Sequence, residues 1–212
     1  MNAFRKIQRN LQDYGFGITA RKAMLFPFRW LYRKRDYRIY RADLATLPFP
    51  PPTDGSLEYR WITPGDRDLI RQIEVMEEWM QDKIAPKLQA GGLCLSAIGS
   101  GKLAGFNLVG FGCQHIPAVE RTHTFPSHCA WSEQISVSLE FRGQGVASEL
   151  RYRVFAELRR RGITRLYGGT MTDNLVALKL ARRVGFREIL DIRFRKYFGV
   201  HSWHYARLNR GR

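Results

Sequence analysis

The fold of this 212-residue chain is decided by the segment Leu139-Glu140-Phe141-Arg142-Gly143-Gln144-Gly145-Val146-Ala147. The residues from Trp131 to Leu139 alternate as in a strand, and the residues from Val146 to Arg161 predict a helix. A helix that begins directly after a glycine-rich turn presents free backbone N–H groups to an anion. Gly143 and Gly145 let a phosphate approach the backbone closely, and Arg142 adds a fixed positive charge. The segment therefore predicts a pyrophosphate site between a strand and a helix.

Strands and helices alternate on both sides of this segment. The order is strand, helix, two strands, a long loop, then strand, helix, strand, helix and two strands. The expected strands are 57–62, 93–98, 103–111, 131–139, 163–167, 194–198 and 202–208. The expected helices are 63–80, 146–161 and 174–184, and residues 112–130 are expected to form the loop. This order predicts an α/β (α+β) domain.

The chain outside that region divides into two further parts. Residues 1–47 predict an N-terminal arm with helical spacing, rich in basic and aromatic side chains. Residues 48–56 contain the run Pro50-Pro51-Pro52 and predict a stiff linker, which leaves 57–212 as the domain. Two interpretations of the arm stay open. It is either an interfacial segment that binds a membrane surface, or a pair of helices packed on the core.

Charge is spread unevenly over the chain. The formal net charge is +16, and it gathers at both ends: residues 1–41 carry eleven Lys and Arg against two acids. Such a field attracts polyanions, namely CoA phosphates, nucleic acid or an anionic membrane surface. Three irregularly spaced cysteines and the lack of a transmembrane or secretory pattern favour a reduced, cytoplasmic protein. Peripheral attachment to the inner membrane face is the alternative location.

Two motifs resemble those of the GNAT superfamily of acyl-CoA N-acyltransferases. Arg142, Gly145 and Ala147 match the superfamily's acyl-CoA signature, and residues 174–180 with 184–186 match its second motif at the usual distance. The resemblance covers roughly residues 57–208. It implies the GNAT fold, a mixed central sheet flanked by helices in which parallel strands 4 and 5 splay apart.

The resemblance also implies particular binding roles. Pantetheine would lie between the splayed strands, next to exposed backbone near Val137 and Leu139, and Asn174 would contact it. A backbone N–H near Val137 would hold the developing oxyanion. The CoA pyrophosphate would be held by the backbone amides of Gly143, Gln144, Gly145, Val146 and Ala147. The implied co-substrate is acetyl-CoA or a longer acyl-CoA, and no metal is expected.

An attacking amine needs a base, because a free alkylamine is mostly protonated at neutral pH. Glu133 is the candidate, since it shares parity with Trp131, Ile135 and Val137 and is therefore expected on the same sheet face. His128 and His123 are rivals. Where many superfamily members carry a tyrosine acid, this chain has Ala181, which makes room for a longer acyl chain. Other groups that could supply the acid are Tyr167, Tyr197, His201 and His204.

Three functions follow from these expectations. The first is transfer of an acetyl or longer acyl group to a primary amine on a small metabolite. The second is N-acylation of a long-chain amino lipid at a membrane surface, a ceramide-type synthesis, which the basic and aromatic arm favours. The third is a non-catalytic module that binds acyl-CoA or associates with nucleic acid, although no nucleic-acid motif is present. The patterns leave the acceptor, the acyl length and the oligomeric state open.

Overall fold

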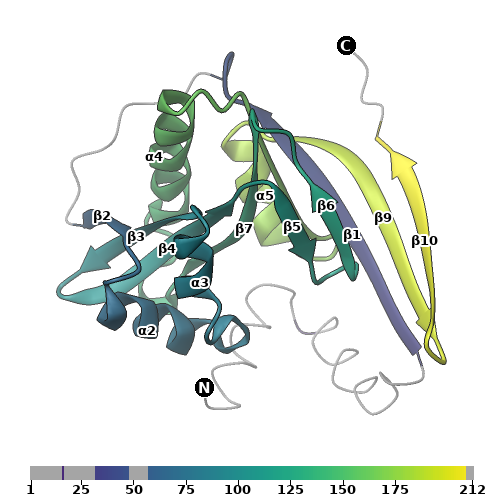
Figure 1. Cartoon of the computed structure of the whole chain (residues 1–212), viewed down its shortest axis with the longest axis horizontal. Helices are drawn as coiled ribbons and strands as arrows, with labels where there is room; N and C mark the ends of the chain where they lie inside the picture. The colour runs from purple at the N-terminus through teal and green to yellow at the C-terminus, as the bar shows by residue number, and fades with distance from the viewer. Residues whose placement is uncertain (1–15, 17–31, 48–56, 209–212) are drawn as a thin grey trace. The chain divides into compact units, whose positions relative to one another are not determined.

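The fold is that of a computed structural model, which describes residue 16 and the ranges 32–47 and 57–208. Its strands form a mostly antiparallel, partly parallel sheet flanked by helices (Figure 1), which confirms the expected fold class. The chain falls into two compact units. The first holds residues 43–114 and 124–167, and the second holds the N-terminal residues up to 42, residues 115–123 and residues from 168 onward.

The sheet of the first unit runs in the order β8-β7-β4-β3-β2. Its strands are β2 (Glu58–Ile62), β3 (Leu93–Gly99), β4 (Lys102–Gly110), β7 (Cys129–Val137) and the start of β8 (Arg165–Met171). The pairs from β2 to β7 are antiparallel. β7 and β8 are parallel, because α4 (Val146–Arg160) connects them as a crossover.

Three short helices pack on the strands of this unit: α2 (Arg67–Met76), the 3-10 turn η2 (Glu78–Met80) and α3 (Ile84–Gln89). They share an apolar cluster with β2, β3 and β4, made of Ile62, Ile70, Ile73, Met80, Ile84, Leu88, Cys94, Leu103, Phe106 and Leu108. The single helix expected from Thr63 to Met80 is wrong in both bounds. Pro64 and Gly65 form a turn instead, and the helix breaks at Glu77, whose backbone is extended (φ −130°, ψ 80°).

α4 supplies the other large apolar surface of the first unit. Its side chains Leu150, Val154, Phe155 and Leu158 are buried to 0% exposure. They recur at helical spacing, so one face of the helix is apolar, whereas Arg159 and Arg160 in its last turn are exposed. This burial holds the first turn of α4 at the end of β7.

The second unit contains a sheet in the order β10-β9-β1-β8, with α5 (Leu175–Arg183) beside it. Its strands are β1 (Tyr32–Asp43), β9 (Arg187–Tyr197), β10 (Val200–Arg207) and the end of β8. β1 pairs with β9 from Tyr32↔Tyr197 to Arg41↔Arg187. The helical spacing expected up to residue 40 is therefore wrong for β1, where side chains alternate with period two.

Alternation explains why β1 is a strand. Tyr37 and Ile39 are buried, whereas Lys34, Asp36 and Arg38 lie on the opposite face. The expected arm therefore contributes a strand to the sheet. The domain boundaries at 47 and 56 remain a prediction, and residues 1–31 of the arm lie outside the described residues except for Phe16.

The expected loop 112–130 contains a hairpin of two short strands, β5 (Cys113–Ile116) and β6 (Arg121–Thr124). Residues 115–123 belong to the second unit, where Arg35 Nη1 donates to the carbonyl oxygens of Pro117 and Ala118. All four residues of β6 are polar, so the alternation of apolar residues did not predict this strand.

Candidate acyl-CoA site

A β-bulge in β7 determines where its side chains point. Leu108 of β4 pairs with Gln134 and Val109 pairs with Ser132, so Glu133 is an extra residue between two ladder positions. An extra residue interrupts the alternation of side chains between the two faces. The expectation that Glu133 shares a face with Ile135 and Val137 rested on an unbroken strand, and the bulge removes that basis.

The contacts of Glu133 confirm the effect of the bulge. Its Oε1 accepts a hydrogen bond from Lys87 Nζ of α3 at 2.5 Å, and its side chain is only 9% exposed. Ser136, three residues further along, also contacts the helical segment, through Glu77. Glu133 and Ser136 therefore face the same helices, and Glu133 is an ion-paired carboxylate.

Glu77 is a second carboxylate on this face, and sequence reasoning missed it. Its Oε1 accepts from Ser136 Oγ at 2.8 Å and its Oε2 accepts from Trp79 Nε1 at 3.0 Å. The residue is 4% exposed and stands at the break between α2 and η2. Ser136 directly precedes Val137, so Glu77 reaches β7 closer to Val137 than Glu133 does. In the sequence Glu77 is one glutamate within an amphipathic helical pattern, and nothing in that pattern predicted its contact with β7.

A buried arginine fixes β7 from the side of α4. Arg151 is 3% exposed, and its Nη1 donates to Ser132 Oγ of β7 and, at 3.3 Å, to Asn107 Oδ1 of β4. Asn107 and Ser132 are themselves buried. One cation therefore satisfies polar groups on two neighbouring strands, at the residue next to the bulge.

The variant Arg151→Ala is expected to lower the free energy of unfolding by about 3 kcal/mol, because two buried polar groups lose a charged donor. Urea denaturation followed by circular dichroism measures this loss. Arg160→Ala is the matched control, since Arg160 lies on the same helix but its side chain is 72% exposed. A midpoint for Arg151→Ala equal to that of the control would contradict the assigned role.

The turn after β7 has the backbone geometry that its glycines predict. The 3-10 turn η3 (Leu139–Phe141) leads into Gly143 (φ +80°) and Gly145 (φ +81°), and both lie in the left-handed region. A side chain at either position would meet no atom within 4 Å of its Cβ, so the turn is open. Gly145 is the N-cap residue of α4 and provides no side-chain cap.

The open turn leaves a run of backbone donors. Within the part of the chain that the structure describes, the N–H groups of residues 143–147 donate to no acceptor, and the first bond of the helix is Glu149 N–H to Gly145 O at 3.1 Å. These donors stand at the positive end of a 15-residue helix. The expected residues Gly143, Gln144, Gly145, Val146 and Ala147 therefore lie together in a turn whose geometry can hold an anion.

The flanking side chains of the turn brace it against β7. Arg142 Nε donates to the carbonyl oxygen of Val137 at 3.3 Å, and Gln144 Nε2 donates to Glu140 O at 3.0 Å. Val137 pairs with Gly105 of β4, where a Cβ would lie 2.7 Å from Ser136 O. Gly105 therefore permits the close approach of the two strands at the end of β7.

Asn174 belongs to the second unit, where it caps α5. Its Oδ1 accepts from the N–H of Ala177 at 3.0 Å. This is the ordinary helix-cap role, and contact with pantetheine stays a prediction. Ala181 is buried in α5 at 6% exposure.

Three of the rival groups lie far from Val137 along the chain or contact other residues. His128 precedes β7 and Val137 ends it, and nine residues of strand span about 30 Å. His201 faces Glu120 at 3.6 Å, and Tyr197 stacks on Tyr32 in the second unit. Burial raises the pKa of the Cys94 thiol, which disfavours it as a nucleophile.

Among the described residues, no group of three or more His, Cys, Asp and Glu side chains could hold a metal ion. None of the helices in the described ranges is long and apolar enough to span a membrane.

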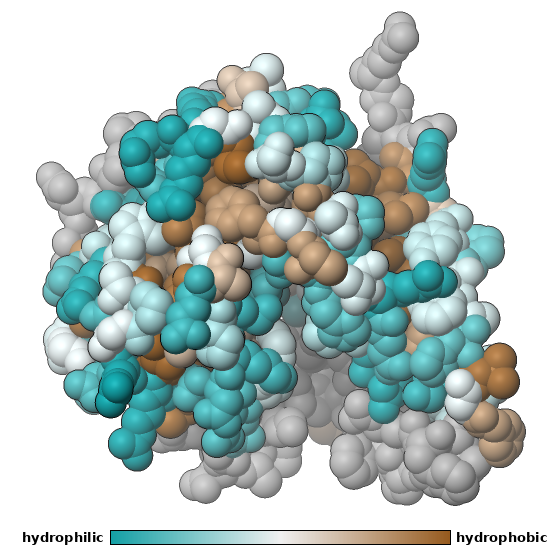
Figure 2. Space-filling model, in the orientation of Figure 1, coloured by the Kyte–Doolittle hydropathy of each residue, from teal (hydrophilic) through white to brown (hydrophobic). Residues whose placement is uncertain are grey.

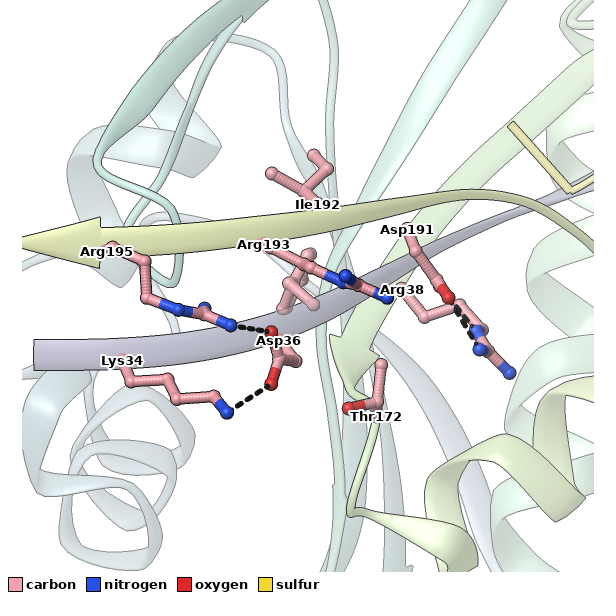
Figure 3. A pocket seen from close by; sticks show the side chains of 9 residues that line it. Lys34, Asp36, Arg38, Thr172, Asp191, Ile192, Arg193 and Arg195 are labelled. Carbon is pink, nitrogen blue, oxygen red and sulfur yellow. Dashed lines mark hydrogen bonds and ion pairs between the residues drawn. The ribbon is translucent and has the colours of Figure 1, made fainter. Parts of the chain in front are cut away.

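A polar pocket of about 360 Å³ lies in the second unit, on the face of β1 and β9 (Figure 3). Its charged side chains form ion pairs: Asp36 pairs with Lys34 and Arg195, and Asp191 pairs with Arg38. The hydrogen bonds that Arg38 donates to the Asp191 carboxylate raise the pKa of Arg38. This face is a ladder of ion pairs between two strands.

The open turn at the start of α4, the crossover between parallel strands and the mixed sheet define a class of α/β protein that can hold an anion at a helix N-terminus. Residues 57–186 match the family model described as the Acetyltransferase (GNAT) family, and this chain belongs to that family. The description of that family is one of acetyltransferases.

Solved structures share the fold. A GNAT-family acetyltransferase from Novosphingobium aromaticivorans is 21% identical, with a TM-score of 0.53, over 74% of this chain and 60% of that one. An N-acetyltransferase of the same family from Sphaerobacter thermophilus is 21% identical, with a TM-score of 0.56, over 86% and 58%. An aminoglycoside N-acetyltransferase in complex with CoA is 20% identical, with a TM-score of 0.50, over 62% and 92%.

At these identities the likeness shows the fold alone. The chain spans about three-fifths of the length of the first two structures. No curated protein sequence matches it significantly.

Proposed function

We propose that this protein transfers an acetyl or longer acyl group from CoA to a primary amine, by direct attack of the amine on the thioester. The observation that carries the proposal is the open turn at the start of α4, with five successive N–H groups that have no acceptor among the described residues. The CoA pyrophosphate would accept from them, and the Arg142 guanidinium would add charge at the same turn. The N–H near Val137 would hold the developing oxyanion.

Native mass spectrometry of the purified protein tests the binding step, because a retained acyl-CoA would reveal its chain length. A panel of primary amines with acetyl-, octanoyl- and palmitoyl-CoA tests transfer, with free thiol release as the readout. Acyl-CoA binding without transfer to any amine would favour the non-catalytic module. Absence of acyl-CoA binding would contradict the proposal.

The carboxylates Glu77 and Glu133 support an amine as the acceptor. Both are largely buried on one face of the sheet, near the end of β7 where the thioester would lie. A cationic ammonium is attracted to such a face, and one carboxylate would take its proton before attack. Glu133 is the candidate base that the sequence predicts. Glu77, acting through Ser136, is the second candidate, and the hydrogen bonds favour it.

The leaving thiolate does not require a dedicated acid. A free thiol has a pKa near 8.5, so the thiolate leaves readily without full protonation. Ala181 at the usual tyrosine position is therefore compatible with turnover. Its small side chain would suit an acyl chain longer than acetyl.

The second candidate acceptor is a long-chain amine held in a membrane. It is supported by the +9 charge and nine aromatic residues of residues 1–41. The enzyme would then work at an anionic inner membrane surface and take its amine from the lipid phase. Nucleic acid is the weaker alternative polyanion.

A chain that lacks residues 1–31 tests this arm. The truncation removes six of the eleven cations of residues 1–41 but keeps β1, which pairs with β9. Since each cation near an anionic surface contributes roughly 1 kcal/mol, vesicle affinity is expected to fall at least about tenfold. Co-sedimentation measures the affinity, and circular dichroism checks the fold. Unchanged affinity would show that the arm does not bind lipid.

A further inference from the structure

The tip of the β9–β10 hairpin projects apolar side chains into solvent. Phe198 is 79% exposed, Val200 is 72% exposed and Tyr197 is 53% exposed. Figure 2 shows apolar surface at the lower right, over the end of this hairpin. An apolar projection of this kind at a strand turn adds nothing to the core of the unit.

The backbone conformation at the tip is strained for a bulky residue such as Phe198. Phe198 (φ +44°) and Gly199 (φ +86°) are the two central residues between paired Tyr197 and Val200, as in a type I′ turn. Asn or Asp is favoured at the first of these positions, and a bulky residue there is strained. Within the described residues Phe198 has no ring contact or hydrogen bond that would offset the strain. Strain that yields no internal contact points to a role outside the molecule.

Cations stand directly behind the apolar tip. The strand register makes one row of Tyr32, Tyr197 and Val200, and Tyr32 stacks on Tyr197 with a ring-centroid distance of 4.7 Å. The next row holds Arg33, Lys196 and His201, and the row after it holds Lys34, Arg195 and Ser202. Successive rows lie about 3.4 Å apart. Positive charge therefore begins one residue behind the apolar edge.

Behind the tip, the cationic side chains outnumber the described carboxylates that pair with them. Six cations lie on β1 and β9 within this end of the sheet, namely Arg33, Lys34, Arg35, Arg193, Arg195 and Lys196. Among the residues that the structure describes, two carboxylates form ion pairs with members of this set: Glu120 with Arg33 and Lys196, and Asp36 with Lys34 and Arg195. Figure 3 shows the Asp36 pairs on one face of these strands. The remaining positive charge is complementary to an anionic surface.

We propose that the β9–β10 hairpin tip is a membrane-docking element, which inserts Phe198 and Val200 among anionic lipids. Aromatic side chains partition to the level of the headgroups, where cations a few ångströms behind them meet the lipid phosphates. Tyr197 and Tyr32 lie at the boundary between the apolar tip and the cations behind it. The chain enters β1 at Tyr32, so the basic, aromatic residues 1–31 are attached at this same end of the sheet. The docking element is independent of the proposed reaction.

Vesicle binding by the full-length protein tests the proposal. The probes are phosphatidylcholine vesicles with and without roughly one-third phosphatidylserine, at low and high salt. The wild-type protein is expected to co-sediment with the anionic vesicles and to be released in part by salt. Binding that is equally strong to neutral vesicles would contradict a role for the cations.

The decisive variant is Phe198→Asn with Val200→Thr. Asn suits the first position of a type I′ turn and Thr keeps a β-branched side chain, so the hairpin should keep or gain stability. Affinity for anionic vesicles is expected to fall at least about tenfold, with an unchanged or higher melting temperature. Val75→Thr is the matched control, because Val75 is 65% exposed on α2 in the first unit.

Two results would overturn the proposal. One is a Phe198→Asn/Val200→Thr protein that binds anionic vesicles as tightly as Val75→Thr does, which would leave binding to other parts of the chain. The other is a wild-type protein that ignores all vesicles. If light scattering then showed that the double variant changes the oligomeric mass, the tip would be assigned to contact between protein chains.

Discussion

Gly145→Leu is expected to abolish acyl-CoA binding, with a loss of at least about a hundredfold in affinity by isothermal titration calorimetry. The N–H groups of residues 143–147 can hold a pyrophosphate only if it lies against the backbone. No atom stands within 4 Å of a Cβ at Gly145, so a leucine side chain would meet no steric clash there, although its positive φ would be strained. It would occupy the space that the phosphates need.

Gly162→Leu is the control that separates blockage from strain. Gly162 ends α4 with φ +77°, close to the +81° of Gly145, and its Cβ position is also free of neighbours within 4 Å. Leucine in this region costs roughly 1–2 kcal/mol, so both variants should lose similar stability. Only Gly145→Leu should lose affinity for acyl-CoA. Unchanged affinity in Gly145→Leu would move the CoA site away from this turn.

Glu133→Gln is expected to lower turnover by roughly 10²–10⁴, with acyl-CoA affinity nearly intact, because an amide cannot take a proton from the acceptor amine. The competing explanation is that Glu133 has a structural role, because its carboxylate is paired with Lys87 at 2.5 Å. Glu77→Gln must therefore be measured beside it. The variant with the larger loss in kcat, and with a shifted acidic limb of the pH profile, carries the base.

Glu58→Gln is the matched control for both substitutions. Glu58 is an exposed glutamate at the start of β2 in the same unit, and its replacement should leave turnover unchanged. Ser136→Ala adds a test of Glu77, because it removes the hydroxyl that donates to Glu77 at 2.8 Å. Near wild-type turnover in both glutamine variants would assign proton removal to water.

The turn at residues 142–147 and helix α4 follow from the sequence alone. Their geometry depends on contiguous residues: two glycines that accept positive φ, an arginine beside them and an apolar face at helical spacing. The same holds for the β3–β4 hairpin and the Asn174 cap. Local chemistry fixes such elements, so the predicted glycine turn and the order of the strands after it agree with the structure, and its role in holding a pyrophosphate stays a prediction.

Only the tertiary structure decided the rest of the site. Whether residues 32–43 form a helix or a strand depends on β9, which follows them by about 150 residues. The bulge that turns Glu133 toward Lys87 depends on the register between β7 and β4. The approach of Glu77 to Ser136 depends on where α2 breaks and packs. These features arise from pairing between distant segments, and no local pattern of residues specifies that pairing.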